Sequence, residues 1–363
     1  MTHRTTSAIA LAVALIAVSC SDSSEDNSTA TTPAPVDTES SANDTIDPAT
    51  TEPTTTDGTA DTTVASTDPI DSTSTTAASE ASVDDLRIVD LSDSLFEFAA
   101  LGVAPVGNFY EPELLAGTFD NIDADPDIVD AIVGGTNVAP DFALDLEGIA
   151  ALEPDLVITS DGFAPFFGNG IDEIDAGIAP VVVISTEGDW QQRTRAVAEA
   201  VGLDAEADDR IASIEDELNA LRAELEDAGL SGSVVSAVRQ GPTPGEVYAF
   251  VPPSQVSTVL DDLGLVQPAA QSDAGLAEAV FPPPAAQYRL SEELLLEHDG
   301  DTILFGEVAP GDLDAFTSGP LASALSGVQS GNVAGVSYFV WALPTAVGVE
   351  EILRDIRLHV LEG

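Results

Sequence analysis

Short apolar runs alternate with helical patterns along residues 84–363, and this alternation is typical of a largely parallel α/β arrangement. The apolar runs fall into two groups, separated by a long helical segment. Strands are expected at 87–91, 104–109, 156–159 and 181–184, and then at 233–238, 246–250, 302–305 and 333–336. Four strands on each side predict two similar α/β lobes.

The strongest helical pattern lies between the two groups of strands. Its apolar positions recur at alternating steps of three and four: Ile211, Ile214, Leu218, Leu221 and Leu225. Gly229 follows where a C-terminal cap is expected. A shorter helix is expected over 190–201, with Gly202 as its stop. The spacing of the long segment also fits a short coiled coil, although it persists for only about two heptads.

The two halves share an acidic spacing. Glu147 precedes Asp155 by eight residues in the first half, and Glu293 precedes Asp301 by eight in the second. Each segment is expected to be a helix with an acidic first turn, followed by a tight turn and a buried strand. An acidic residue in a first turn can also simply respond to the helix dipole, but the matched spacing favours two related lobes.

The amino terminus has the layout of a secretory signal. His3 and Arg4 precede an apolar run over 8–18, and Ser19 stands directly before Cys20. The run is too short for a membrane-spanning helix, which needs about 20 apolar residues. Residues 17–20, Ala-Val-Ser-Cys, resemble the bacterial lipobox, which implies cleavage after residue 19 and a lipid on Cys20. A buried structural cysteine is the alternative, but the neighbouring sequence offers no core.

Composition divides the rest of the chain. Residues 20–84 are almost entirely Ser, Thr, Ala, Asp, Glu and Pro and are expected to form a disordered acidic tether. An N-terminal lobe is expected over 85–187, a helical linker over 188–229 and a C-terminal lobe over 230–363. We therefore expect an extracytoplasmic protein that is anchored to the cell membrane through the lipid on Cys20.

Charge and histidine content exclude several functions. The net charge is −54, and all ten basic residues are arginines, which argues against nucleic-acid binding. Beyond the leader only His298 and His359 remain, and neither has a ligand-like spacing, so no metal site is expected. No nucleophile elbow or phosphate-binding loop is present. The shortage of histidines also argues against a Ser-His-Asp hydrolase.

The ordered motifs resemble the class III substrate-binding proteins of ABC importers, which carry ferric siderophores, haem and vitamin B12. The most specific match is Leu-Glu-Gly-Ile-Ala-Ala-Leu-Glu-Pro-Asp-Leu-Val-Ile at 146–158. Residues 87–97 and 101–107 match the family's opening strand, helix and second strand. Residues 178–184, 259–265, 290–294 and 330–333 match in order further along the chain.

This resemblance implies two α/β lobes joined by a single long helix, with a ligand cleft between the lobes. It also implies that Glu147 and Glu293 dock against arginines of a membrane permease, which works with an ATPase. The ligand would be a small iron chelate, most simply a ferric siderophore, and no cofactor is expected. Vitamin B12 or haem remains an alternative ligand. A cell-surface enzyme or a structural lipoprotein is the alternative from another class.

Ligands of open α/β sheets bind beyond the carboxyl ends of the strands, so residues that follow the predicted strands are the candidates. Aromatic residues are only 5% of the chain, yet several fall at such positions. Arg239 is the strongest candidate, because a guanidinium suits the oxygens of a chelate; a surface salt bridge is its alternative role. The expected ligand-binding residues are Tyr110, Phe163, Trp190, Arg239, Tyr288, Arg289, Tyr338 and Trp341.

Overall fold

The computed structural model describes residues 86–363, apart from 112–114, 116–118, 120–123, 186–187, 242, 244, 273–285 and 291. The predicted signal peptide, Cys20 and the tether lie outside the described residues. Within the described ranges, no helix has the combination of length and apolar character that crossing a bilayer requires.

The N-terminal lobe is built on a five-stranded parallel sheet with the order β3-β2-β1-β4-β5. The central strand β1 is buried along its whole length. The second strand is shorter than predicted, because only residues 107–108 pair with β1. The strands are β1 (Ile88–Leu91), β2 (Gly107–Asn108), β3 (Thr136–Asn137), β4 (Leu156–Ser160) and β5 (Val181–Ile184).

Helices and turns connect these strands. Asp125 and Asp145 each begin a helix by accepting a backbone N–H bond, which satisfies one of the free donors of the first turn. The helical segments are α1 (Leu95–Ala100), α3 (Pro126–Val133), η3 (Pro140–Phe142), α4 (Leu146–Ala151), η4 (Ala164–Phe167) and α5 (Gly170–Gly177).

The C-terminal lobe has a mixed five-stranded sheet with the order β10-β9-β6-β7-β8. Strands β6, β9 and β10 are parallel, whereas β7 is antiparallel to both of its neighbours. The expectation of a largely parallel arrangement therefore holds, with β7 as the exception. The strands are β6 (Val235–Gln240), β7 (Val247–Phe250), β8 (Gln287–Leu290), β9 (Thr302–Glu307) and β10 (Val333–Ser337).

Two groups of helices accompany this sheet. Strands β6 and β7 pack through Ala237 and Phe250 into one core with α8, α11, α12 and the long helix α7 (Asp204–Asp227). The opposite face packs through Val238 and Phe305 into a second core with α9 and η7. The helical segments are α8 (Gln255–Asp262), η6 (Glu292–His298), α9 (Asp312–Thr317), η7 (Ala322–Ala324), α10 (Ser326–Ser330), α11 (Tyr338–Ala342), α12 (Ala346–Ile356) and a π-helical turn at Arg357–Leu361.

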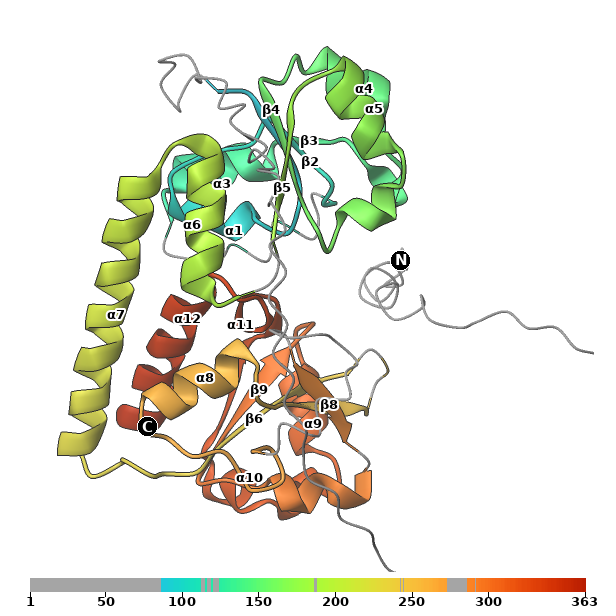
Figure 1. Ribbon diagram of the computed structural model, residues 1–363. Helices are drawn as coiled ribbons and strands as arrows, with labels where there is room; N and C mark the ends of the chain where they lie inside the picture. The colour runs from blue at the N-terminus through green and yellow to red at the C-terminus, as the bar shows by residue number, and fades with distance from the viewer. Residues whose placement is uncertain are drawn as a thin grey trace, which may run out of the picture. The chain divides into compact units, whose positions relative to one another are not determined.

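Two helices lead from the first sheet to the second (Figure 1). Helix α6 spans Trp190–Val201 and ends at Gly202, whose φ of 76° lies in the left-handed region. Helix α7 spans Asp204–Asp227, and its predicted apolar stripe is buried. Ala207 packs into the core of the N-terminal lobe, whereas the stripe from Ile211 to Leu225 packs into that of the C-terminal lobe. The two α/β lobes joined by one long helix are therefore confirmed.

The acidic repeat has the same structural role in both lobes. The Oδ2 atom of Asp155 accepts a 2.9 Å bond from the backbone N–H of Arg87, just before β1. The Oδ2 atom of Asp301 accepts a 2.9 Å bond from the N–H of Val234, just before β6. Asp155 thus links the start of β4 to the start of its neighbour β1, and Asp301 links the start of β9 to that of β6. The same hydrogen bond occurs in both lobes.

A glycine in β9 allows the elements of the C-terminal lobe to approach closely at the carboxyl edge. Gly306 pairs with Arg239 of β6 and Val336 of β10. A Cβ atom at this position would lie 3.0 Å from the Cβ of Arg239 and 3.3 Å from the Cβ of Tyr338. Both separations are tighter than ordinary carbon contacts, so Arg239 and Tyr338 would have to give way by a few tenths of an ångström to accept a side chain at 306.

We therefore predict that Gly306→Ala lowers the free energy of unfolding by about 1–3 kcal/mol, the usual effect of overpacking a core. Chemical denaturation of the purified chain measures the change. Gly177→Ala is the matched control, since a Cβ there meets nothing within 4 Å, and it should be neutral or slightly stabilising. Equal stability of Gly306→Ala and the wild type would contradict this account of the packing.

Candidate functional site

The carboxyl ends of β1, β2 and β4 lie side by side in the N-terminal sheet. Tyr110 follows β2 and packs on a cluster that joins α1 to the C-terminal lobe. That cluster combines Leu95 and Phe96 of α1 with Val340 of α11 and Val347 of α12. Elements of the C-terminal lobe therefore lie against this edge of the N-terminal sheet, where the sequence placed the ligand.

Aromatic rings gather at the same edge. Tyr110 stacks on Phe109 with ring centroids 4.2 Å apart, and Phe163 lies 5.1 Å from Phe109. Phe166 is 45% exposed, although its ring contacts two others. The aromatic cluster consists of Phe109, Tyr110, Phe142, Phe163, Phe166 and Phe167. Tyr110 and Phe163, which were predicted separately, are thus brought together.

A buried ion-pair group lies beside Tyr110. Arg193 of α6 donates through Nε to Oε1 of Glu97 at 3.0 Å and through Nη2 to Oδ1 of Asp93 at 2.5 Å. Glu97 is fully buried and Arg193 is 4% exposed. Asp90, at the end of β1, is also fully buried and accepts bonds from Ser92. Helix α6 is thereby fastened to the loop after β1.

Burial shifts the pKa values of this group. It raises the pKa of Glu97 to about 7, although Arg193 opposes the change. It also raises the pKa of Asp90 well above its ordinary value. Burial, followed by the nearby carboxylates of Asp93 and Asp90, raises the pKa of Tyr110. Charged forms are unfavourable in a dry site, so burial opposes the negative charge of these groups, and Arg193 offsets that effect at Glu97.

Arg239 lies between two tyrosine rings in the C-terminal lobe. Its guanidinium carbon is 4.4 Å from the ring centroid of Tyr248 and 4.4 Å from that of Tyr338. Its Nη1 donates to the backbone oxygen of Gln240 at 2.7 Å, and its Nε donates to Oε1 of Gln287. The face of each tyrosine ring attracts the positive charge of the guanidinium, so this stacking stabilises the charged form of Arg239. Burial lowers the pKa of Arg239.

The side chain of Arg239 is 1% exposed and that of Tyr338 is 6% exposed. The alternative that Arg239 forms a surface salt bridge is therefore wrong. Direct contact with a ligand would require a tyrosine to move aside. The ligand-binding role of both residues stays a prediction, and the structure adds Tyr248 and Gln287 to their surroundings.

The two tryptophans occupy one hydrophobic core with Tyr338. Trp341 is fully buried, and its Nε1 donates to Oδ2 of Asp355 at 2.8 Å. Trp190 is 8% exposed and begins α6. Burial favours a packing role for both indoles, and their assignment to the ligand site stays a prediction.

Tyr288 and Arg289 are neighbours on β8 but have different surroundings. Tyr288 packs on the core beneath α9. The side chain of Arg289 is 61% exposed and pairs with Glu246. The structure therefore does not bring these two residues together with Tyr110 and Phe163, and their ligand-binding role is likewise untested.

The two predicted docking glutamates are both exposed. Glu147 lies in the first turn of α4, after the capping residue Asp145. Glu293 lies in the 3-10 helix η6. Each glutamate lies on the helical segment that precedes a repeated aspartate, Asp155 in the N-terminal lobe and Asp301 in the C-terminal lobe.

Among the described residues, no group of three or more His, Cys, Asp and Glu side chains could hold a metal ion. His298 is buried, and this burial lowers its pKa to about 4. It is therefore neutral near pH 7.

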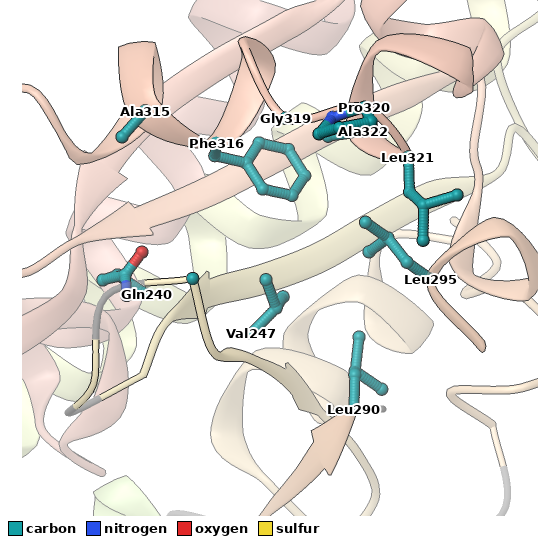
Figure 2. A pocket seen from close by; sticks show the side chains of 11 residues that line it. Gln240, Val247, Leu290, Leu295, Ala315, Phe316, Gly319, Pro320, Leu321 and Ala322 are labelled. Atoms are coloured by element: carbon teal, nitrogen blue, oxygen red, sulfur yellow. The ribbon is translucent and has the colours of Figure 1, made fainter. Parts of the chain in front are cut away.

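A small pocket lies in the C-terminal lobe (Figure 2). Its volume is about 120 Å³, below the range of about 300–1,000 Å³ typical of ligand pockets. Gln240 lines it, whereas Arg239 is the preceding residue of β6, so the two side chains leave opposite faces of the strand. Apolar side chains dominate its wall: Val247, Leu290, Leu295, Phe316 and Leu321. The pocket is therefore separate from the tyrosine-stacked arginine.

Several residues of this region were not predicted: Asp90, Asp93, Glu97, Arg193, Tyr248 and Gln287. One signal was present in the sequence. Arg193 lies three residues after Trp190 and four before Val197, which places it on the apolar face of the expected helix. A rare cation on an apolar face predicts buried carboxylate partners.

Comparisons with known proteins bear on the family and the fold. The sequence profile of a family described as "periplasmic binding protein" matches residues 116–337. No curated protein matches the chain.

Solved structures of related fold cover most of the chain. A siderophore periplasmic binding protein from the fuscachelin gene cluster of Thermobifida fusca is 21% identical, with a TM-score of 0.61 over 77% of this chain and 96% of that one. A component of a ferrichrome ABC transporter from Bacillus subtilis is 20% identical, with a TM-score of 0.59 over 77% of this chain and 96% of that one.

A third structure is the triscatecholate siderophore binding protein FeuA from Bacillus subtilis, complexed with ferri-bacillibactin. It is 20% identical, with a TM-score of 0.56 over 78% of this chain and 95% of that one. The TM-scores, at these low identities, establish a shared fold and nothing more. Together with the family profile, which covers more than half of the chain, they show that the protein belongs to the periplasmic binding protein family and has the class III substrate-binding fold.

Proposed function

We propose that this protein binds a ferric siderophore outside the cytoplasm and delivers it to an ABC importer. The observation that carries the proposal is the family match over residues 116–337, in a chain whose fold is shared with siderophore-binding proteins. Members of the family are extracytoplasmic substrate-binding proteins rather than enzymes. The iron chelate is their cargo, and no cofactor is needed.

The proposed ligand site is the carboxyl edge of the N-terminal sheet, opposite α11. Tyr110 and Phe163 supply aromatic surface there, and Phe166 extends it toward solvent. On the C-terminal lobe, the proposed contact is Tyr338, with Arg239 stacked behind its ring and reachable only if a tyrosine moves aside. Vitamin B12 or haem remains an alternative cargo, because both also offer large flat surfaces to aromatic rings.

Glu147 and Glu293 are proposed to dock on arginines of the permease. Their support is exposure on equivalent segments of the two lobes, each followed by the aspartate that fastens a strand. One carboxylate on each lobe suits two contacts with a permease dimer, because a carboxylate can accept two parallel bonds from one guanidinium.

Cys20 is proposed to carry the lipid that keeps the protein at the membrane. The support is the sequence alone: a short apolar run, Ser19 and then the single cysteine of the chain. A thioether-linked diacylglyceryl group would provide two acyl chains, which meets the usual requirement for stable anchoring.

The binding prediction is tested by fluorescence titration of the purified chain. A ferric siderophore absorbs light and should quench the emission of Trp190 and Trp341, with saturation at micromolar concentration or below. Ferrichrome, ferri-bacillibactin, cyanocobalamin and haemin are the probes. Saturation with a corrinoid or haemin alone would establish the alternative cargo, and a lack of saturation with all four would refute the proposed function.

The docking prediction is tested by uptake of radiolabelled iron in cells that contain the importer. Glu147→Ala and Glu293→Ala should each reduce uptake at least tenfold and leave ligand affinity unchanged, since neither residue lies at the proposed ligand site. Glu173→Ala and Glu297→Ala, also exposed glutamates of the two lobes, are controls that should transport normally. Reduced affinity in the docking variants would place those residues at the ligand instead.

The anchoring prediction is tested with Cys20→Ser. Without its thiol the chain cannot take the lipid, so the protein should move from the membrane fraction to the soluble fraction. Its affinity for the ligand should stay within about twofold, because the change lies outside the binding lobes. A variant that remains in the membrane fraction would contradict lipid attachment at this residue.

A further inference from the structure

The charges at the carboxyl edges of both sheets restrict which chelates this protein can accept. The N-terminal edge presents exposed carboxylates directly beside the aromatic cluster. Glu111 immediately follows Tyr110 and accepts a 2.9 Å bond from Asn137, while Asp161 immediately follows β4 and accepts a 3.1 Å bond from Ser185. Neither of these bonds neutralises the charge of the carboxylate.

The arginines near these edges offer little positive charge to a ligand. Arg193 is held by Asp93 and Glu97, and only 4% of it is exposed. Arg289 is exposed but pairs with Glu246. Arg239 is covered by Tyr248 and Tyr338, with 1% exposed.

The other described arginines lie on other parts of the fold. Arg87 precedes β1, at the opposite edge of the sheet, and the rest lie on α6, α7, α12 and the final π-helical turn: Arg195, Arg210, Arg222, Arg354 and Arg357. The sequence contains no lysine. Apart from histidines, Arg193, Arg239 and Arg289 are therefore the only basic residues at the described carboxyl edges. The protein as a whole carries a net charge of −54, which repels an approaching anion.

We infer that the site selects ferric chelates without net negative charge, an inference that rests on the proposed function. Three hydroxamate groups, each with one negative charge, neutralise one ferric ion. Three catecholate groups, each with two, leave a complex with three negative charges. The aromatic cluster can hold the organic surface of the neutral complex, whereas a trianion would meet Glu111 and Asp161 with no exposed unpaired cation in return. The ligand class is therefore a trihydroxamate chelate rather than a triscatecholate.

The test compares two probes of different charge on the full chain: ferrichrome, which is neutral, and ferri-bacillibactin, which is a trianion. At low salt, where charges interact over about 30 Å, ferrichrome should bind at least about tenfold more tightly, which corresponds to about 1.4 kcal/mol. Added sodium chloride should narrow this difference by strengthening the binding of the trianion, because it screens repulsion.

A matched pair of double variants locates the effect. E111Q/D161N should tighten ferri-bacillibactin binding by about three- to tenfold at low salt and leave ferrichrome binding within about twofold. D216N/E217Q removes two charges from exposed positions in the middle of α7, and it should change neither affinity by more than about twofold.

The outcomes separate the two proposals. Equal or tighter binding of ferri-bacillibactin at low salt would overturn the charge selection and leave siderophore binding intact. An equal effect of the two double variants would also overturn it, since the selection would then not arise at the carboxyl edge. Failure of every ferric siderophore to bind would instead overturn the proposed function itself.

Discussion

The apolar stripe of helix α7 is the interaction on which the two-lobed arrangement depends. Its first buried residue, Ala207, belongs to the core of the N-terminal lobe, and Ile211 through Leu225 belong to the core of the C-terminal lobe. Trp190, at the start of α6, enters that second core too. The segment between the sheets is therefore packed rather than free, and it is supplemented by the cluster of α1 with α11 and α12. Large hinge motions would have to break these apolar contacts, so small closing motions are the expected response to a ligand.

Much of this architecture could be predicted from the sequence because it follows from buried apolar periodicity. Helix α6 has the predicted bounds, and α7 carries the predicted apolar stripe and ends just before Gly229, the expected cap. Strands β3 and β8 were not predicted. Strand β3 consists of Thr136 and Asn137 at a sheet edge, where no apolar signal is required. Strand β8 is Gln-Tyr-Arg-Leu, and its polar residues give no apolar pattern from which a strand could be predicted. Its buried Gln287 is held by a hydrogen bond from Arg239 rather than by apolar packing.

The site was harder to predict than the fold, because it depends on where polar groups are hidden. Position after a strand selected both Tyr110 and Phe163, and the structure places both rings against Phe109, since the carboxyl ends of parallel strands share an edge. The same rule could not show that Arg239 is covered, because its two tyrosines come from β7 and α11, far apart in the sequence. Nor could it show that Arg193 holds Glu97, which lies 96 residues earlier in the chain.

The two lobes share a fold but bury groups of opposite charge at their carboxyl edges. Both use an aspartate to fasten the first strand of the sheet, so the resemblance extends to individual hydrogen bonds. At the carboxyl edge they diverge: the N-terminal lobe buries Asp90 and Glu97 with raised pKa values, while the C-terminal lobe buries a guanidinium with a lowered one. Burial thus moves each group toward its uncharged form. In a chain with 64 acidic residues and ten basic ones, the proposed ligand surface would be aromatic with an acidic rim, and its charge would discriminate between ligands rather than attract them.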